Sequence, residues 1–289
     1  MRFQSGNLVR NGVLAALVPL LASCGDGVIA PKGPIAKAEL TILQNATAIM
    51  LAVIVPVIVL TVVFAWWFRS GNRRARYLPN WEYSGRIEMI VWSIPTLVIV
   101  FLGGIAWVSS HELDPSRAIG SGPRPLEVDV VSLDWKWLFI YPSEGIASVN
   151  HLVVPVGVPV EFHLTSGSVM NSFFVPQLGS QIYTMAGMVT RLNLQADQAG
   201  SYQGLSAQFS GEGFSDMRFE LSAVSPDQFS AWIEEAKSKQ EQLDMAGYDA
   251  LAQPSKAVPP ISFGRVAPDL FEAIVTGQAN ASVSSQQVQ

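Results

Sequence analysis

Few side chains in this sequence could bind a redox metal or act as a nucleophile. The 289 residues contain one cysteine, Cys24, and three histidines, His111, His151 and His163. The histidines lie 12 or more residues apart, and no Cys-x-x-Cys or His-Glu-x-x-His spacing occurs. We therefore interpret them as structural or surface residues. No Gly-x-Ser-x-Gly elbow occurs and no evident nucleophile accompanies the histidines, which argues against a hydrolytic enzyme.

The composition excludes several other classes. Hydrophobic residues make up 49% of the chain and charged residues 14%, whereas disordered chains are polar. Lys and Arg number 18 against 23 Asp and Glu, so no basic excess is available to neutralise a nucleic acid. A single cysteine excludes an internal disulfide framework. The apolar excess indicates membrane segments together with one soluble domain.

The first 23 residues have the form of an export signal. Arg2 and Arg10 precede a short apolar stretch at 12–22, which ends in small residues directly before Cys24. This arrangement resembles the bacterial lipobox. It predicts a lipoprotein signal peptide at 1–23 and a mature chain that begins at Cys24, carrying N-acyl and S-diacylglycerol groups. Residues 24–39 then form a lipid-anchored segment. The alternative is that Cys24 is a buried free thiol.

Two membrane-spanning helices are predicted within residues 40–110. Residues 40–68 and 89–110 contain no charged residue, and each run exceeds the roughly 18 uncharged residues typical of a spanning helix. Pro56 and Pro95 lie inside these runs, where neighbouring helices can compensate for a lost hydrogen bond. We therefore expect kinks rather than breaks.

The loop between the two runs is basic. Its only acidic residue before the second run's edge is Glu82, against five arginines: Arg69, Arg73, Arg74, Arg76 and Arg86. The positive-inside rule places this loop in the cytoplasm. The sequence thus predicts a multi-pass lipoprotein of the bacterial inner membrane, with the N-terminus and the C-terminal domain in the periplasm.

After a Pro/Gly-rich linker at 111–125, residues 126–225 show short strand patterns separated by Gly/Pro turns. Val128 and Val130 alternate with acidic residues, whereas Leu133, Trp135 and Trp137 alternate in the opposite phase. This change of phase predicts a bulge or break around residues 130–131. Further strands are expected at 150–154, 160–166, 172–175, 188–194 and 217–224. Such strands predict a Greek-key sandwich or barrel.

The pattern becomes helical after this domain. Phe229, Trp232, Ile233 and Ala236 recur at helical spacing. We therefore expect a helical C-terminal extension at 226–276, with Pro226 and Asp227 at its start, and a disordered tail at 277–289.

Several long motifs resemble subunit II of the heme–copper respiratory oxidases. They are residues 131–142 (VSLDWKWLFIYP), 168–183, 202–211, and Glu88 followed by residues 91–95 (VWSIP). The resemblance covers essentially the whole mature chain. It implies a two-helix transmembrane hairpin, a periplasmic cupredoxin-like Greek-key domain, and a heme–copper subunit I as the main partner.

Family members that accept electrons from cytochrome c carry a two-copper centre in this domain. Its ligands are two thiolates, two imidazoles, a thioether and a backbone carbonyl. In this chain the imidazole, thiolate and carbonyl positions are occupied by Asn171, Leu205, Ala207, Phe209 and Gly213, and the thioether position falls near Met217. None of the first five offers the soft sulfur or imidazole donors that such copper sites require. With Cys24 used for acylation, a mononuclear blue-copper site also fails.

The copper-free pattern resembles the quinol-oxidising branch. It implies a subunit of a proton-pumping ubiquinol oxidase that binds no cofactor itself, with heme, copper and chemistry in subunit I and with subunits III and IV as further partners. The chain would support assembly and cap the periplasmic face of subunit I. No cytochrome c or nucleic acid partner is expected.

Individual residues receive roles from the same resemblance. Trp135 and Trp137 fall where the cytochrome c branch has electron-entry aromatics, and we favour packing for both. Asn171 is expected to make hydrogen bonds in place of a ligand. The run 171–183, with Phe173 and Phe174, is expected to face subunit I. Glu88 either pairs with Arg86 at the interface or lies at the mouth of a proton path.

Two alternatives remain open. A cytochrome c oxidase subunit II would need the copper ligands that Leu205, Phe209 and Gly213 do not provide. A stand-alone membrane-anchored lipoprotein, acting as a binding or assembly module, would not co-purify with a heme-bearing subunit.

Overall fold

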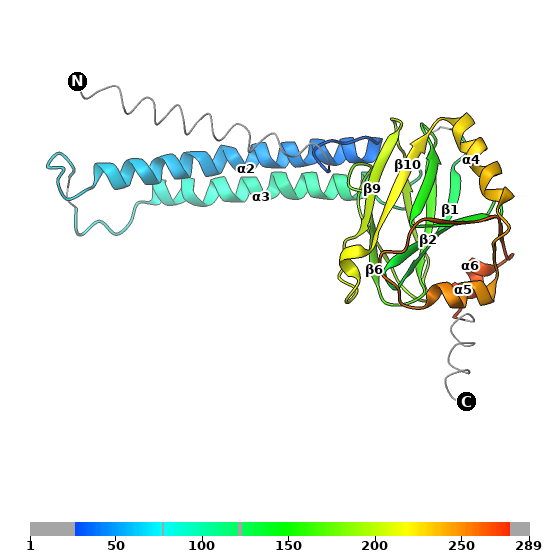
Figure 1. Cartoon of the computed structure of the whole chain (residues 1–289). Coiled ribbons are helices and arrows are strands. Elements are labelled where there is room, and N and C mark those ends of the chain that lie inside the picture. The colour runs from blue at the N-terminus through cyan, green and yellow to red at the C-terminus, as the bar shows by residue number, and fades with distance from the viewer. Residues whose placement is uncertain (1–26, 77, 121–122, 278–289) are drawn as a thin grey trace, which may run out of the picture. The chain divides into compact units, whose positions relative to one another are not determined.

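A computed structural model describes residues 27–76, 78–120 and 123–277, which separate into two compact units. One unit comprises residues 38–114. The other combines residues 115–277 with the described residues before 38 (Figure 1). The signal peptide, Cys24 and residues 278–289 of the expected tail lie outside the described residues.

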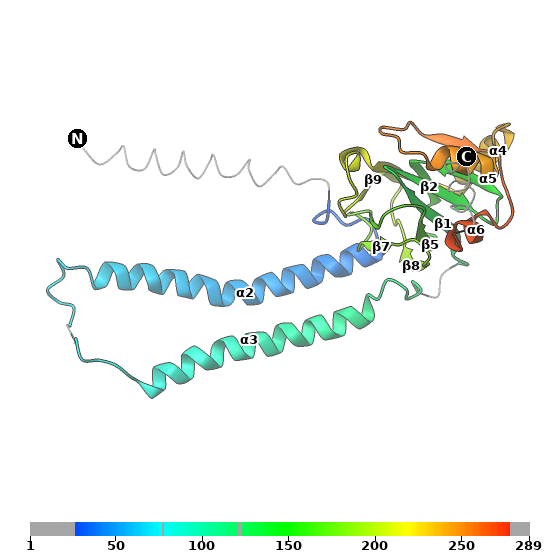
Figure 2. The same cartoon turned by 90° about the horizontal axis from the view of Figure 1, so that it is seen from below.

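The unit of residues 38–114 is formed by two long helices and their connecting loop (Figure 2). Helix α2 spans Pro34–Trp67 and α3 spans Gly85–Glu112. Both are long and apolar enough to cross a membrane, and no residue in the most apolar stretch of either is buried. Pro56 and Pro95 lie inside continuous helices, so neither proline breaks its helix.

The second unit is a β-sandwich followed by a C-terminal extension. Sheet A has the strand order β12-β3-β2-β1-β5-β8, and sheet B has β4-β10-β9-β6-β7. Within these two sheets the β1–β5 and β4–β10 pairs are parallel, and the other pairs are antiparallel. The strands are β1 Leu126–Leu133, β2 Lys136–Tyr141, β3 Ile146–Val149, β4 His151–Pro155, β5 Val160–Ser166, β6 Asn171–Phe174, β7 Ile182–Thr184, β8 Thr190–Leu194, β9 Gly200–Ser206, β10 Arg218–Val224 and β12 Ile261–Phe263.

Aromatic rings fill the core between the two sheets. The Phe173 ring stacks on Phe219 with centroids 5.1 Å apart and meets the edge of Trp137 at 5.4 Å. All three side chains are at most 4% exposed. Gly204 on β9 permits this packing, because a Cβ there would lie 2.0 Å from the Phe219 ring. These contacts join β2, β6 and β10 across the sandwich.

The expected break at residues 130–131 is wrong. Strand β1 runs without interruption to Leu133, and the chain turns at Asp134 and Trp135 before β2 begins. The change of phase arises because both faces of β1 are buried. Val130 faces the core between the sheets, whereas Val131 and Leu133 face a second apolar cluster on the other side of sheet A. A strand covered on both faces shows no alternation of polar and apolar residues.

The C-terminal extension builds this second cluster and is not purely helical. Its Leu243, Tyr248, Leu270 and Ile274 pack against sheet A, and β12 joins the edge of that sheet beside β3. The elements are α4 Pro226–Ser238, β11 Gln242–Leu243, α5 Met245–Ala252, β12, β13 Arg265–Val266 and α6 Leu270–Val275.

Helix α4 begins with a full capping box, stronger than the start expected from the sequence. Ser225 Oγ accepts a hydrogen bond from the Gln228 backbone N–H, and the Gln228 side chain accepts from the Ser225 backbone N–H. Two otherwise unpaired N–H groups at the helix start are thereby satisfied.

Buried polar groups hold the extension on sheet A. The Lys136 ammonium donates to the Gln253 carbonyl at 2.8 Å and to that of Asp134 at 3.1 Å. The Asn150 amide donates to the Val258 carbonyl at 2.8 Å. Burial lowers the pKa of Lys136. Each contact satisfies a donor that would be costly to bury alone.

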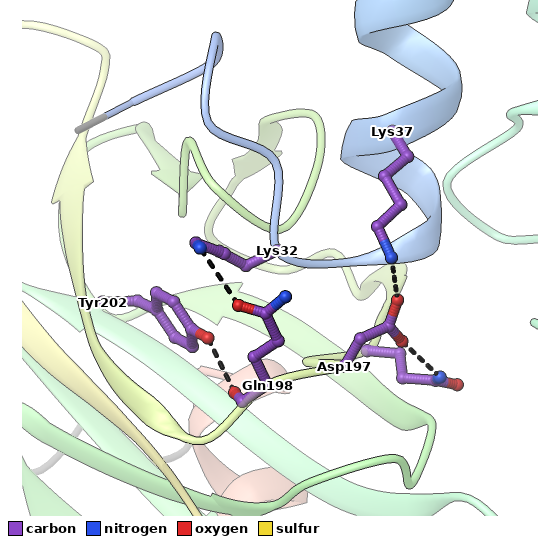
Figure 3. A network of polar contacts seen from close by, with 6 residues as sticks. Lys32, Lys37, Asp197, Gln198 and Tyr202 are labelled. Carbon is purple, nitrogen blue, oxygen red and sulfur yellow. Dashed lines mark hydrogen bonds and ion pairs between the residues drawn. The ribbon is translucent and has the colours of Figure 1, made fainter. Parts of the chain in front are cut away.

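Residues 32–37, which include the first turn of α2, are bound to the sandwich by a polar network (Figure 3). Lys37 and Asp197 form an ion pair at 2.6 Å, and Lys32 donates to the Gln198 side chain at 3.0 Å. The backbone N–H of Asp197 donates to the Lys32 carbonyl at 2.8 Å. Gly33 is required here, because a Cβ would lie 2.3 Å from the Gln195 carbonyl oxygen. The first turn of α2 is therefore part of the sandwich unit.

Candidate functional site

The positions that the resemblance assigns to copper ligands lie at one end of the sandwich. Asn171 begins β6, Leu205 lies near the end of β9, and the other three fall in the loop of residues 207–217 that follows. Antiparallel pairing of β6 with β9 brings these segments together, and the Ala207 N–H donates to the Ser172 carbonyl at 2.9 Å. The 207–217 loop contains a short 3₁₀ helix at Phe214–Asp216.

Asn171 is fully buried and cross-links this end through hydrogen bonds. Its amide N–H donates to the Val169 carbonyl at 3.1 Å. Its carbonyl oxygen lies 3.0 Å from Ser206 Oγ, which is also 3.1 Å from the Gln208 carbonyl. A hydroxyl donates to one acceptor at a time, so Ser206 shares its proton between the strand and the loop. In the structure, Asn171 therefore acts as a hydrogen-bonding residue.

The Trp135 indole lies directly against the 207–217 loop. It sits in the turn between β1 and β2 with a φ of 65°, and its Nε1–H donates to the Ser210 carbonyl at 3.0 Å. A Cβ on Gly213 would lie 2.4 Å from the ring. Lys256 of the extension lies 5.7 Å from the ring centroid and forms an ion pair at 2.6 Å with Glu212. The indole therefore fills the space that a side chain at position 213 would need.

The remaining positions offer no better donors. Leu205 is half-buried, Ala207 is exposed, and Phe209 is 71% exposed with its ring against Phe214. Met217 is buried, and its sulfur lies 3.8 Å from Ser210 Oγ, which donates to it. Copper sites of this family's kind need thiolate donors, which alkyl and phenyl groups cannot replace. The residues of this loop do not fit the two-copper centre.

The other aromatic candidates have distinct positions. Trp137 and Phe173 are fully buried in the core, Trp135 packs against its margin, and Phe174 is half-buried. The expectation that the run 171–183 faces subunit I drew on its apolar residues, but the ring of Phe173 is covered by the sandwich itself and cannot contribute to such a surface.

Exposed apolar side chains do occur at this end of the sandwich, in β7 and in the segments next to β6, β8 and β9. They are Val169, Met170, Tyr183, Met188, Val189 and Phe209, each at least 41% exposed. We call this set the apolar rim. Sequence reasoning included Tyr183 in the run 171–183 but missed the other members, which lie outside the strands where no periodicity marks them.

The three histidines lie on separate elements. His111 is near the end of α3, where Nδ1 lies 2.7 Å from the Trp107 carbonyl. His151 Nε2 on β4 lies 3.0 Å from Ser222 Oγ. His163 on β5 lies between two carboxylates, 3.2 Å from Asp129 and 3.3 Å from Glu161. Within the described residues, no group of three or more His, Cys, Asp or Glu is arranged to hold a metal ion.

The two histidines of the sandwich have opposite pKa shifts. The hydrogen bond to Asp129 raises the pKa of His163, with a further contribution from Glu161. Burial lowers the pKa of His151, and the nearby Glu220 opposes that effect. These contacts support the interpretation of His163 and His151 as residues that stabilise the fold.

Glu88 lies in the first turn of α3, and its side chain is exposed. The ion pair with Arg86 that one interpretation expected does not form between these two described residues. The physical reason is their spacing, because residues two apart on a helix do not face each other.

Comparison with known proteins places this fold and loop in context. Residues 127–224 match the family model for the cytochrome c oxidase subunit II periplasmic domain, and residues 237–281 match the COX aromatic rich motif. The chain is 48% identical over 274 residues to ubiquinol oxidase subunit 2 of Acetobacter aceti, covering 94% of this chain and 88% of that one. It is 49% identical over 257 residues to cytochrome bo(3) ubiquinol oxidase subunit 2 of Pseudomonas aeruginosa, covering 89% and 78%.

A solved structure of the periplasmic domain of cytochrome oxidase subunit II from Bradyrhizobium japonicum is also similar. It has a TM-score of 0.38 and 23% identity, and covers 41% of this chain and 96% of that one.

An apolar helix pair followed by an oxidase subunit II periplasmic domain defines a subunit of a membrane-bound terminal oxidase. Within that class, the chain belongs to the ubiquinol oxidase subunit 2 family. The resemblance and the fold expected from the sequence are thereby confirmed. The two apolar helices and the periplasmic domain fit an inner-membrane protein.

The contact between Trp135 and Gly213 predicts the effect of a methyl group. Gly213 has a φ of −92°, which alanine adopts freely, so Gly213→Ala tests packing alone. The added Cβ would clash with the indole, and we expect a loss of about 1–3 kcal/mol in the free energy of unfolding. Denaturant unfolding of the full chain in detergent measures it.

Gly247→Ala is the matched control. It lies in α5, where the nearest atom to an added Cβ is 3.4 Å away. Alanine favours helix, so this variant should be as stable as the wild type or slightly more stable. Equal stability of all three proteins would contradict the packing of Trp135 on residue 213.

The opposite pKa shifts of His163 and His151 predict opposite pH dependences. His163 has a raised pKa, so its contribution is fully present below the ordinary pKa of 6.5 and is lost as pH rises through the folded-state pKa. The difference in unfolding free energy between wild type and His163→Gln should therefore shrink as pH rises from about 5.5 to about 9.

His151→Gln provides the internal control. The pKa of His151 is lowered, so the neutral form is the one the fold favours, and protonation on acidification costs stability. The difference between wild type and His151→Gln should grow as pH rises. Parallel pH trends for the two variants would refute the assignment of their partners.

Proposed function

We propose that this chain is the non-redox subunit II of a proton-pumping ubiquinol oxidase. In this role it supports assembly of the complex and caps the periplasmic face of subunit I, which holds the heme and copper. The observation that carries the proposal is the Trp135 indole lying against Gly213, in a loop whose side chains supply neither thiolate nor imidazole. A loop of this kind cannot hold the two-copper centre through which a water-soluble donor delivers electrons. Quinol, which is lipid-soluble, instead reaches the complex within the bilayer.

The apolar rim is the surface that we assign to subunit I. Its exposed side chains include Met170 at 41%, Met188 at 52% and Phe209 at 71%, and they share one end of the sandwich with the 207–217 loop. An apolar patch of this kind on a polar domain is typical of a protein contact. The bare apolar surfaces of α2 and α3 suit packing against further membrane helices and lipid. Subunits III and IV complete the proposed complex.

Lipidation completes the proposed topology. Acylation of Cys24 would tether the N-terminus at the outer membrane surface, on the side of the periplasmic domain. The arginine-rich loop between α2 and α3 would then lie in the cytoplasm.

Purification tests this function directly. A tag on this chain should recover a heme-bearing polytopic subunit in stoichiometric amount, and the complex should oxidise ubiquinol but not reduced cytochrome c. Copper should be absent from this chain once it is separated from its partners. Stoichiometric copper on the isolated chain, or rapid oxidation of cytochrome c, would overturn the proposal. Recovery without any heme subunit would favour a stand-alone lipoprotein module.

We further propose that Glu88 lies at the mouth of a proton path in subunit I. It is an exposed carboxylate, unpaired with Arg86, in the first turn of α3. An ionisable residue on a membrane-spanning helix is a candidate for a functional site such as a proton relay. Glu88→Ala should slow quinol oxidation severalfold in a fully assembled complex, measured as oxygen consumption.

Glu82→Ala is the control, since it removes the other carboxylate of the same loop region. Its turnover should match the wild type. Wild-type turnover in assembled Glu88→Ala, or equal slowing in both variants, would reject a specific role for Glu88.

A further inference from the structure

The loop that follows α2 encloses a cavity of about 590 Å³ at the end of the apolar helix. Three aromatic rings, one leucine and two arginines line it: Trp67, Phe68, Leu78, Trp81, Arg74 and Arg76. All six lining residues belong to the unit of residues 38–114, at the end of α2 and in the loop that follows it. Nothing in the oxidase chemistry proposed above uses it.

Asn72 organises the turn that joins the two parts of this lining. Its side-chain amide donates to the Trp67 carbonyl at 2.6 Å, near the end of α2. Its backbone N–H donates to the Arg69 carbonyl at 2.9 Å, and its side-chain oxygen accepts from the Arg74 N–H at 3.1 Å. The turn therefore folds the chain back so that Arg74 and Arg76 stand beside the Trp67 and Phe68 rings.

The cavity carries positive charge that the chain does not neutralise. Residues 69–86 hold five arginines and one glutamate, a net charge of +4 (5 − 1). Arg69 lies over the Trp66 ring, 5.2 Å from its centroid. Arg74 and Arg76 are both exposed, and neither side chain forms an ion pair with another described residue. Two guanidinium groups are thus available to an anion.

The combination of aromatic, aliphatic and guanidinium groups has a specific chemical meaning beside a membrane span. Tryptophan rings settle at the level of lipid headgroups, and guanidinium groups bind phosphate oxygens in a bidentate manner. Basic pockets next to spanning helices suit anionic headgroups. We propose that this cavity binds one anionic phospholipid, with its phosphate on Arg74 and Arg76 and its acyl chains along Phe68 and Leu78.

The shared chemistry, a phosphate anion, could also come from free inorganic phosphate. The apolar part of the lining favours the lipid over free phosphate, because Phe68 is 59% exposed and Leu78 is 53% exposed, and acyl chains would cover both side chains. Free phosphate would leave both side chains in water.

Native mass spectrometry of the full chain in detergent tests the proposal. The delipidated protein is mixed with phosphatidylglycerol or with phosphatidylcholine, and retained lipid is counted. Wild type should retain one phosphatidylglycerol and little phosphatidylcholine. The double variant Arg74→Gln/Arg76→Gln should bind phosphatidylglycerol more weakly, by about 10- to 30-fold.

Arg73→Gln is the matched control, because Arg73 belongs to the same loop but does not line the cavity. It should bind within about twofold of wild type. Equal binding by the double variant, or equal retention of both lipids, would overturn the proposal.

Two further measurements decide the source of the anion and the accessibility of the cavity. In the first, inorganic phosphate is added to the protein with phosphatidylglycerol bound. If inorganic phosphate abolishes lipid binding through Arg74 and Arg76, the acyl chains contribute nothing to affinity and the site is assigned to free phosphate. The same lipid count on the purified oxidase complex should again show one phosphatidylglycerol sensitive to the double substitution. Its loss on assembly would mean that a protein partner fills the cavity, which also refutes lipid binding.

Discussion

The packing of the Trp135 indole against the 207–217 loop governs the organisation of this end of the sandwich. The ring touches Gly211 and Gly213, donates to the Ser210 carbonyl and lies beneath Lys256. One side chain thereby joins the β1–β2 turn, the loop after β9 and the C-terminal extension. Aromatic contacts and hydrogen bonds of the chain itself thus position the loop. If the exposed rim beside it contacts subunit I as proposed, this contact would form on a surface that is already ordered.

Both faces of sheet A are likewise covered by other parts of the same chain. One face packs on sheet B through aromatic rings, and the other is covered by the extension through Tyr248, Leu270 and Ile274. Lys136 and Asn150 contribute polar anchors that fix where the extension lies, since each donor must find its carbonyl. Apolar burial supplies the larger part of the stability, and the anchors select one arrangement.

Much of the architecture could be predicted from the sequence, for reasons that differ by element. The membrane helices follow from length and the absence of charge, which no tertiary contact alters. Strand β10 follows from its strict alternation, because one side of it faces the core and the other faces water. The β1–β2 turn could not be predicted, because the extension buries the second face of β1 and removes the alternation that marks a strand end.

The candidate site was predictable only in part. The chemical types at positions such as Leu205 and Phe209 are visible in the sequence, and they suffice to exclude copper ligands. The position of Trp135 against Gly213, the burial of Phe173 and the exposure of Phe209 depend on contacts between segments distant in the chain. No local pattern in the sequence encodes such contacts. The apolar rim and the arrangement of the 207–217 loop can therefore be recognised only in the structure.

The late position of β12 in the chain has a consequence for biogenesis. This strand pairs with β3 at the edge of sheet A, although more than 100 residues separate the two along the chain. Non-local pairing of this kind is slow and cannot begin until the distant segment has been synthesised. Until then β3 presents an open edge and sheet A an uncovered apolar face, both of which invite aggregation.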